Sequence, residues 1–418
     1  MWLGARLAKL AGDVRDSYWF VPALLALGGV LAGLGLVYAD ARLGDAWLGR
    51  FQWLYGSRPE GARAVLSAIG GSTITVAGVV FSTTLAAVTY ASGQFGPMLL
   101  SNFVRDRGNQ ATLGVFIGTF LYCLVVLRTI RSAEETSADT GGAVRDAFVP
   151  QLAILGALAF AVLSIAMLIY FVHHVTDGIH VNNLVARIGH GLLDDVADRR
   201  ERPGPAGAPP APPGPDAWTC PAPTTGYVLS VDAEELLKTA CRRGARVTAL
   251  AGPGDFVHRG HPILLIEGPR SPELERSGGA FAIGRKRSRD NDLRFALDEL
   301  VEIAARALSS GVNDPFTAVA CIDWLGAALS ELERLPRLGG TVSGEGGGTL
   351  TMPVLDFAAF LEAGAGRLRR YAAGDAIAGG RLLAALDAVR AGAEDGRNRA
   401  LIDEEKRRLR TAMAEKES

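Results

Sequence analysis

Four long stretches without a charged side chain constrain this 418-residue chain more than any other feature. They are Ser17–Ala39, Ala64–Val104, Gly108–Leu127 and Ala147–Val172. A helix needs about 20 mostly apolar residues to cross the hydrocarbon layer of a bilayer, and each stretch meets that length. The pattern predicts four transmembrane helices, at about 18–38, 64–94, 110–128 and 148–173. The first stretch has no small-residue cleavage site after it, so we do not interpret it as a signal peptide.

The composition excludes several classes of protein. The formal net charge is −1, which gives no reason to expect nucleic acid as a partner. The four cysteines, Cys123, Cys220, Cys241 and Cys321, form no Cys-x-x-Cys pair, so there is no zinc or redox signature. Their placement is more typical of a reducing compartment than of a disulfide framework. Four spans leave both ends of the chain on one side. We predict that this side is the cytoplasm, because the N-terminal tail is short and basic and the large C-terminal part carries unpaired cysteines.

The second half of the chain is polar and changes character several times. Apolar residues recur at helical spacing after the fourth span, which predicts an amphipathic helix that continues that span out of the membrane. Nine prolines between 203 and 223 then indicate a linker. We predict a mainly α membrane protein: four transmembrane helices, then a cytosolic α+β region with a small β-rich module and a helical C-terminal part. The expected divisions are 1–173 for the membrane domain, 174–200 for the connecting helix, 201–224 for the linker, 225–270 for the β-rich module and 271–418 for the helical domain.

Local patterns give the expected elements of the soluble part. Residues 225–231 and 245–251 are typical of strands, and between them Asp232 is placed to cap a short helix. A glycine-rich break at 339–349 leads to no Gly-Lys-Ser/Thr sequence, so we interpret it as a flexible segment and not as a phosphate loop. Helices are expected at about 353–372, 374–392 and 395–415.

The second apolar stretch carries a line of hydroxyl groups. Thr75, Ser82 and Thr89 are seven residues apart and share one helix face, and Ser92 and Gln94 lie further along. Lipid offers hydroxyls no hydrogen-bond partner, so this face should meet protein or water. One interpretation is close helix packing through small residues, and the other is the wall of a pore.

Arginines flank the predicted spans. Arg105 would lie at the cytoplasmic surface, where it would anchor the chain to lipid phosphates or bind a solute. Arg128 and Arg131 would lie one turn apart on the end of the third helix. They would extend to the interface or, if several copies assemble, attract anions at a pore mouth.

His173, Asp177 and His180 would share a face of the helix that leaves the fourth span. The two histidines would be more than about 10 Å apart along the helix axis, so one helix does not easily bring both to a single ion, and we expect no metal. A polar helix at the level of the lipid headgroups and a protonation switch are the other interpretations.

The segment RALSSGVNDPFTA is the most motif-like part of the soluble region. Gly311 suits the position after a helix, and Asp314 followed by Pro315 suits the N-cap and first position of the next helix. Arg306, Asn313 and Thr317 accompany them. We interpret the segment as a hydrogen-bonded helix junction at a subunit or domain contact, with an anion or other ligand site as the alternative.

Four segments carry a resemblance to a known family. FSTTLAAVTYASGQFGPMLLSNFVRDRGNQATLGVFIGTFLYCLVVLRTIR, YFVHHVTDGI, GDFVHRGHPIL and RALSSGVNDPFTA resemble, in this order, the bacterial predicted-membrane-protein family catalogued as domain of unknown function 2254. The family pattern has Pro-Arg at Pro97-Met98 and Ser-Pro-Gly at 309–311. The resemblance implies a multi-pass protein of the bacterial inner membrane, and it implies no activity.

These observations lead to one preferred function. No catalytic triad, metalloprotease motif or phosphate loop is present in the sequence, so we expect neither an enzyme nor a cofactor. We predict a homo-oligomeric ion channel or small-solute pore, with the lipid bilayer and a small ion or solute as its partners and a cytosolic domain for assembly or gating. The alternative is a non-conducting membrane sensor or scaffold whose cytosolic domain binds a ligand or partner.

Overall fold

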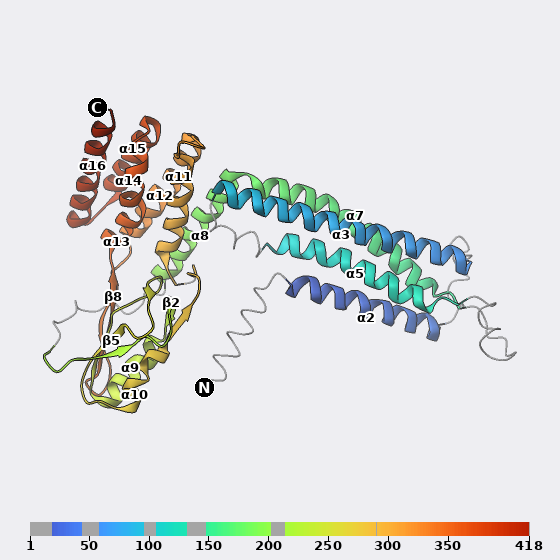
Figure 1. The fold of residues 1–418 in the computed structure, drawn as a ribbon, viewed down its shortest axis with the longest axis horizontal. Helices are drawn as coiled ribbons and strands as arrows, with labels where there is room; N and C mark the ends of the chain where they lie inside the picture. The colour runs from blue at the N-terminus through green and yellow to red at the C-terminus, as the bar shows by residue number, and fades with distance from the viewer. Residues whose placement is uncertain are drawn as a thin grey trace. The chain divides into compact units, whose positions relative to one another are not determined.

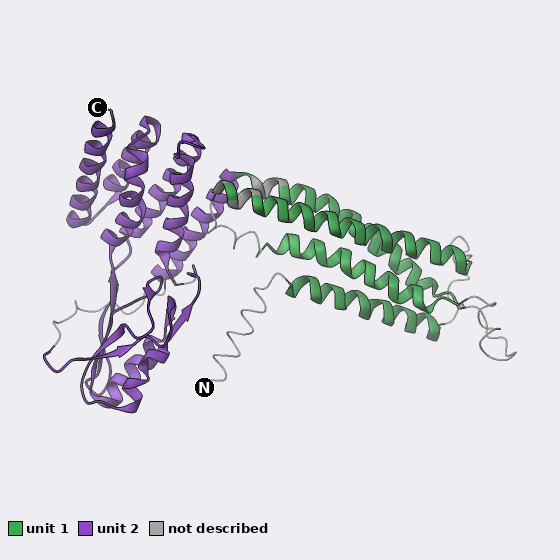
Figure 2. Cartoon of the chain, in the orientation of Figure 1, with its two compact units in different colours: residues 1–180 green, residues 181–418 purple. Residues whose placement is uncertain are grey.

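The computed structural model describes residues 19–43, 58–95, 106–131, 148–201, 214–289 and 291–417. The chain divides into two compact units, unit 1 at residues 1–180 and unit 2 at residues 181–418 (Figure 2). The described residues of unit 1 are almost entirely helical, whereas unit 2 combines two sheets with helices (Figure 1).

Unit 1 contains four described helices that are long and apolar enough to cross a membrane. They are α2 (Phe20–Leu43), α3 (Pro59–Phe95), α5 (Arg107–Thr129) and α7 (Gln151–Ile179). The four predicted apolar spans are therefore confirmed as helices. Helix α3 begins five residues before the uncharged stretch, because Pro59 suits the first position of a helix, where the backbone N–H has no partner within the helix.

Helix α5 lies at the centre of the bundle and packs against α2, α3 and α7. Half of the most apolar 18-residue stretch of α5 is buried, against 17% of the corresponding stretch of α2. Helices α2 and α5 approach so closely that a Cβ atom on Gly29 would lie 2.3 Å from the carbonyl oxygen of Gly118. Only glycine permits this backbone contact, which is a common way for membrane helices to pack.

Polar side chains inside the bundle pair between α5 and α7. The hydroxyl of Tyr122 donates to the carbonyl oxygen of Ala153 at 2.6 Å. The hydroxyl oxygens of Thr119 and Ser164 are 3.1 Å apart, and both residues are buried. These contacts satisfy groups that lipid could not.

The fourth span does not continue into the next helix as predicted. Helix α7 ends at Ile179, His180 adopts extended backbone angles, and α8 (Val181–Glu201) begins directly after it. The apolar face of α8 is buried in unit 2 against α11 (Leu293–Ala307) and α12 (Pro315–Glu333). The apolar periodicity correctly indicates a helix, but it does not reveal the break.

Two sheets form the β-rich part of unit 2. The order of the five-stranded sheet is β1-β5-β3-β8-β7, with β3 and β8 parallel and the other neighbours antiparallel, and the three-stranded antiparallel sheet has the order β4-β2-β6. The strands are β1 (Trp218–Pro221), β2 (Gly226–Val231), β3 (Arg246–Ala249), β4 (Phe256–Val257), β5 (Pro262–Glu267), β6 (Phe281–Gly284), β7 (Leu338–Ser343) and β8 (Thr349–Leu355).

Short helices accompany these sheets. Helix α9 (Ala233–Arg243) has the predicted cap, because the Asp232 carboxylate accepts a hydrogen bond from the N–H of Glu235 at 3.0 Å. Helix α10 (Pro272–Glu275) and the 3₁₀ turn η3 (Ser277–Ala280) follow β5. One apolar core, which includes Ile263, Leu264 and Ile266, joins these elements.

Two parts of the sheets fall where the sequence predicts other structure. Strand β1 lies inside the range 201–224, which was expected to be a linker, and it pairs with β5. The glycine-rich break at 339–349 is a hairpin between β7 and β8 and not a flexible segment. Gly346 and Gly347, with φ of 96° and 82°, adopt the left-handed conformation that makes this turn. Residues other than glycine rarely adopt this conformation, because their Cβ atom disfavours it.

The C-terminal helices follow the prediction closely. They are α13 (Phe357–Leu361), α14 (Arg367–Ala372), α15 (Ala376–Gly392) and α16 (Gly396–Glu417), with the π-helical turn η4 (Glu362–Gly366) between α13 and α14. Residues 353–355, expected at the start of the first of these helices, belong to β8 instead. Helix α16 is strongly charged, yet Ile402 and Leu409 are fully buried.

Candidate functional site

The hydroxyl line of α3 lies on the outside of the single protomer. Thr75, Ser82 and Thr89 are exposed, whereas Thr73 and Thr84 are buried on the opposite face. Ser92 and Gln94 belong to α3, but their side chains lie outside the described residues. Thr75, Ser82 and Thr89 therefore lie on one exposed face of the protomer, as the sequence predicts.

Two of these exposed hydroxyls use their protons within α3. The Thr75 hydroxyl donates to the carbonyl oxygen of Gly71 and the Thr89 hydroxyl donates to that of Leu85, each at 2.8 Å. A hydroxyl that has donated its proton still has lone pairs for an acceptor role. The exposed face therefore presents oxygen lone pairs to whatever lies beside it.

At one end of the bundle, Asp40 and Arg63 form hydrogen bonds that connect the helix ends. The Asp40 carboxylate at the end of α2 accepts hydrogen bonds from the N–H groups of Leu152 and Ala153 at 3.0 and 2.9 Å. It thereby supplies a cap to the N-terminus of α7, whose own N-cap residue, Pro150, provides none. The Arg63 guanidinium of α3 donates to the carbonyl oxygen of Ile130, just after α5, at 3.1 Å.

The other end of the bundle contains a hydrogen-bonded contact between Asp106 and His174, which we call the Asp106–His174 clasp. Nε2 of His174 lies 2.9 and 2.7 Å from the two carboxylate oxygens of Asp106. Since an ionised carboxylate only accepts hydrogen bonds, Nε2 carries the proton. Asp106 also caps α5 by accepting from the N–H of Gly108 at 2.8 Å. The clasp joins the first turn of α5 to the last turns of α7.

The surroundings of the clasp are tightly packed. The ring of Tyr170 stacks on His174 with centroids 5.2 Å apart. A Cβ atom on Gly108 would lie 2.7 Å from both Nε2 of His174 and the hydroxyl of Tyr170, so glycine is needed there. Asn109 in the same turn is buried, and its side-chain oxygen has no hydrogen-bond partner. Ionisable residues within membrane segments are usually functional, so this end of the bundle is a candidate site.

The sequence alone did not identify the contacts at either end of the bundle. No role was predicted for Asp40, Arg63 or Asp106, because the spacing of residues along the chain does not show which helices are neighbours. A usable signal was present: Asp106 directly precedes an apolar helix, the ordinary place for a cap. The segments RDRGNQ and YFVHH, which carry part of the family resemblance, are the ones that meet at the clasp.

The three predicted arginines have different outcomes. Arg105 lies outside the described residues. Arg128 is exposed in the last turn of α5, whereas Arg131 lies beyond the helix and pairs through its backbone with Phe148. The prediction that Arg128 and Arg131 occupy one helix is therefore wrong, because α5 ends at Thr129.

The polar group at the end of α7 is also divided. His173 is exposed on α7, Asp177 is on the same helix with a side chain outside the described residues, and His180 is exposed after the helix has ended. The extended backbone of His180 removes it from the shared face that the sequence predicts. Over the described ranges, no three His, Cys, Asp or Glu side chains gather in a way that would hold a metal ion.

The helix junction between α11 and α12 forms in the predicted place. The Asp314 carboxylate accepts from the N–H and the hydroxyl of Thr317 at 3.2 and 2.5 Å, and Pro315 occupies the first helical position. The left-handed residue is Asn313, with φ of 49°, and not Gly311 as expected. Arg306 lies in the last turn of α11, where its carbonyl oxygen accepts from Ser309. The junction is satisfied locally, which favours a structural role.

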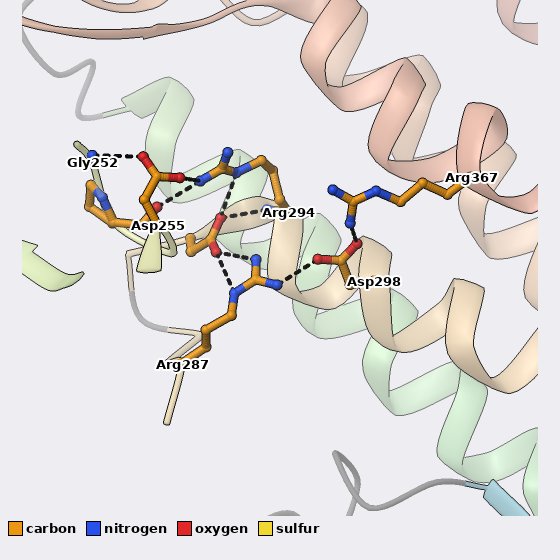
Figure 3. A network of polar contacts seen from close by, with 8 residues as sticks. Gly252, Asp255, Arg287, Arg294, Asp298 and Arg367 are labelled. Atoms are coloured by element: carbon orange, nitrogen blue, oxygen red, sulfur yellow. Dashed lines mark hydrogen bonds and ion pairs between the residues drawn. The ribbon is translucent and has the colours of Figure 1, made fainter. Parts of the chain in front are cut away.

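A buried network of charges joins the loop before β4 to α11 (Figure 3). Asp292, which is 1% exposed, accepts hydrogen bonds from the guanidinium groups of Arg287 and Arg294. Arg294 continues to Asp255 at 3.1 Å, and Arg287 continues to Asp298 at 2.6 Å. Burial lowers the pKa of Arg287, but its hydrogen bonds to the two carboxylates outweigh this effect and raise the pKa above its ordinary value.

This network depends on a glycine of the family-like segment GDFVHRGHPIL. A Cβ atom on Gly254, whose φ is 90°, would lie 1.9 Å from a carboxylate oxygen of Asp292. The next residue, Asp255, accepts from the N–H of Gly252 at 2.9 Å and so fixes the loop. Arg367 of α14 contacts Asp298 and extends the network to the C-terminal helices. The charged residues of this network thus connect the loop before β4, helix α11 and helix α14 within unit 2.

The four apolar helices, with polar groups paired at their ends, define a multi-pass membrane protein. Residues 15–388 match the family described as Predicted membrane protein (DUF2254), and the chain belongs to this family. A Mycobacterium bovis protein and a Mycobacterium tuberculosis protein, both described as uncharacterised, are each 34% identical to this chain over 356 residues. The alignments cover 80% of this chain and 65% of each relative, so the chain spans less than two thirds of their length. No solved structure matches the chain.

Proposed function

We propose that this protein is a homo-oligomeric channel for a small ion or solute, with α3 of each copy lining the pathway. The proposal rests on the chemistry of the exposed face of α3. That face presents Thr75, Ser82 and Thr89 outside the protomer. The oxygen lone pairs on this face are polar groups that protein or water satisfies and that lipid does not.

The exposed faces of two other helices of unit 1 provide the contrast. Helix α2 exposes Leu24, Leu27, Leu31 and Leu34, and α7 exposes Val162, Ile165 and Ile169. Bulky apolar side chains of this kind are suited to contact with acyl chains. Helix α3 also exposes apolar residues such as Val79 and Leu85, but hydroxyl groups and glycines alternate with them.

The hydroxyl line is long enough to serve as a path through most of a bilayer. Thr75 and Thr89 are 14 residues apart, about 21 Å at 1.5 Å per residue, against a hydrocarbon layer of about 30 Å. Gly71 and Gly78 lie on the same face, and a Cβ atom at either position would meet nothing within 4 Å. Small residues of this kind allow a helix of another copy to approach closely.

The oxygen lone pairs supply the chemistry of permeation. Because the Thr75 and Thr89 protons are bonded within the helix, the outward-facing oxygens would accept from water or contact a cation, which replaces part of an ion's hydration shell. In this arrangement the protein lies in the bacterial inner membrane with both termini in the cytoplasm, and unit 2 acts there in assembly or gating.

Ion flux into liposomes tests this function. The purified protein should conduct ions, and the variants Thr75→Val and Ser82→Ala should change the conductance or the ion selectivity. Val162→Ala, on the exposed face of α7, is the matched control and should leave conduction unchanged. If the liposomes conduct nothing over a range of pH and voltage, and the α3 variants instead lower oligomer stability, the hydroxyl line of α3 is a packing surface. The sensor or scaffold alternative would then replace the channel.

A further inference from the structure

The turn between β4 and β5 brings two histidines together. Its residues are His258, Arg259, Gly260 and His261, and the N–H of His261 donates to the carbonyl oxygen of His258 at 3.0 Å. Gly260 has φ of 85°, the left-handed conformation that a type II turn requires at its third residue. The turn therefore places the two histidines at its two ends. It connects β4 of the three-stranded sheet to β5 of the five-stranded sheet.

Backbone contacts from the segment after β1 hold this turn in place. The N–H of Ala222 donates to the carbonyl oxygen of His261 at 2.8 Å, and the N–H of Gly260 donates to that of Ala222 at 3.0 Å. The N–H of Arg259 donates to the hydroxyl of Thr225, also at 3.0 Å. Three bonds to a neighbouring segment fix residues 259–261 of the turn, and the bond from His261 to His258 links His258 to them. This lowers the entropy cost of using the two histidines together.

The imidazole rings are close to one another and are supported from one side. Their centroids lie 5.3 Å apart, at an interplanar angle of 52°. The His258 ring contacts Phe256 edge-on at 5.2 Å, and Phe256 contacts its cross-strand partner Tyr227 at 4.9 Å. Both histidines are exposed to solvent, so a small solute reaches them freely.

We propose that His258 and His261 bind one divalent transition-metal ion, with water completing its coordination. Two imidazole nitrogens at about 2.0–2.1 Å from a tetrahedral ion place their ring centres about 5 Å apart. The separation of 5.3 Å between these rings fits that arrangement. Imidazole favours Cu²⁺, Ni²⁺ and Zn²⁺, whereas Mg²⁺ and Ca²⁺ favour oxygen ligands.

The predicted site is open and exchangeable. Within the described residues there is no set of three His, Cys, Asp or Glu ligands, so the protein contributes two ligands here. A metal held in this way leaves positions for water or for a ligand group from another molecule. Its removal by a chelator should therefore release the ion without unfolding unit 2, unlike removal of a closed structural zinc.

Titration calorimetry with the full-length protein in detergent, purified without a polyhistidine tag, tests the site. Ni²⁺ alone is the probe, and Zn²⁺ and Mn²⁺ are the comparison ions. We expect one Ni²⁺ per chain, bound more tightly than Mn²⁺ as the Irving–Williams order requires. His258→Gln and His261→Gln should each weaken binding by about tenfold or more, because each removes one of the two protein ligands.

His180→Gln is the matched control, since His180 is exposed in a different unit. It should bind Ni²⁺ as the wild-type protein does, and far-ultraviolet circular dichroism should show all three variants folded. Equal Ni²⁺ affinity in the wild type and both turn variants would overturn the proposal, because the ion would then bind elsewhere. Absence of Ni²⁺ binding by the wild-type protein would overturn it as well, and would leave the channel proposal untouched.

Discussion

Nε2 of His174 lies 2.7 Å from Oδ2 of Asp106, so a side chain near the end of α7 holds the residue that caps α5. These two residues are 68 positions apart in the chain. The contact therefore joins the two helices at this end of the bundle. The backbone N–H of Gly108 shares the same carboxylate, which couples helix capping to helix packing.

Breaking the Asp106–His174 clasp should lower the stability of the membrane bundle. His174→Ala should lower the free energy of unfolding by about 1–3 kcal/mol, because it removes a hydrogen bond to a charged group. Asp106→Ala should cost more, since it also removes the cap of α5. Thermal unfolding of the protein in detergent measures both effects.

His180→Ala is the control for the clasp, since His180 is exposed after the end of α7 and should change stability little. The double variant of Asp106 and His174 should lose less than the sum of the two single losses, because both single variants break the same contact. Strict additivity would show that the clasp contributes nothing to stability.

Close packing of α2 on α5 gives a second prediction, from two adjacent glycines. Gly29→Ala places a Cβ atom 2.3 Å from the carbonyl oxygen of Gly118, so the helices must separate. We expect a loss of about 1–3 kcal/mol in the free energy of unfolding. Gly28→Ala meets nothing within 4 Å and should be neutral or slightly stabilising, since alanine favours helix. Equal unfolding temperatures for the two variants would contradict this packing.

The buried charge network of unit 2 gives a third prediction. Asp292→Ala leaves Arg287 and Arg294 without their shared partner, and removing one member of a buried ion pair costs about 3–5 kcal/mol. Chemical denaturation followed by circular dichroism measures the loss. Asp323→Ala, which breaks the exposed pair with Arg381, is the control and should have a small effect. Similar losses in both variants would mean that burial does not matter here.

Glu405 gives a prediction about pH. Burial raises the pKa of its carboxyl above the ordinary value, more than the opposing attraction of Arg369 lowers it. The native state thus holds this proton more tightly than the unfolded state does. The resulting stabilisation is fully present below the ordinary pKa of about 4.3 and is lost as the pH rises through the raised native value.

The variant Glu405→Gln has no proton to lose at this position and should lack that part of the pH dependence. Its stability relative to the wild type should therefore increase as the pH rises from about 4 towards neutrality. Urea unfolding of both proteins across this range gives the comparison. A relative stability that falls with rising pH would show that the pKa is lowered and not raised.

Much of this fold can be predicted from the sequence, for physical reasons. The four apolar stretches have the length and hydropathy that a bilayer demands, and the structure has a helix at each. The caps by Asp232 and Asp314 are local, since each carboxylate bonds an N–H three residues ahead. Local rules are enough wherever all partners lie within one or two helical turns.

Contacts between distant segments could not be predicted in this way. The caps that Asp40 supplies to α7 and the parallel pairing of β3 with β8 each join residues about 100 positions apart. The glycine-rich hairpin at 339–349 was misinterpreted because glycine gives no strand periodicity. The break at His180 falls where apolar residues still recur at helical spacing, so this periodicity does not reveal it and the backbone angles do.

The most direct test of the channel proposal is thiol block of a Thr75→Cys variant in liposomes. A charged, water-soluble thiol reagent should reduce ion flux through this variant, because the side chain at position 75 would face water at the centre of the oligomer. The wild-type protein, which retains its own four cysteines, and Val162→Cys on α7 should conduct normally after the same treatment. Flux through Thr75→Cys that is unchanged although the thiol has been modified would contradict a pathway lined by α3.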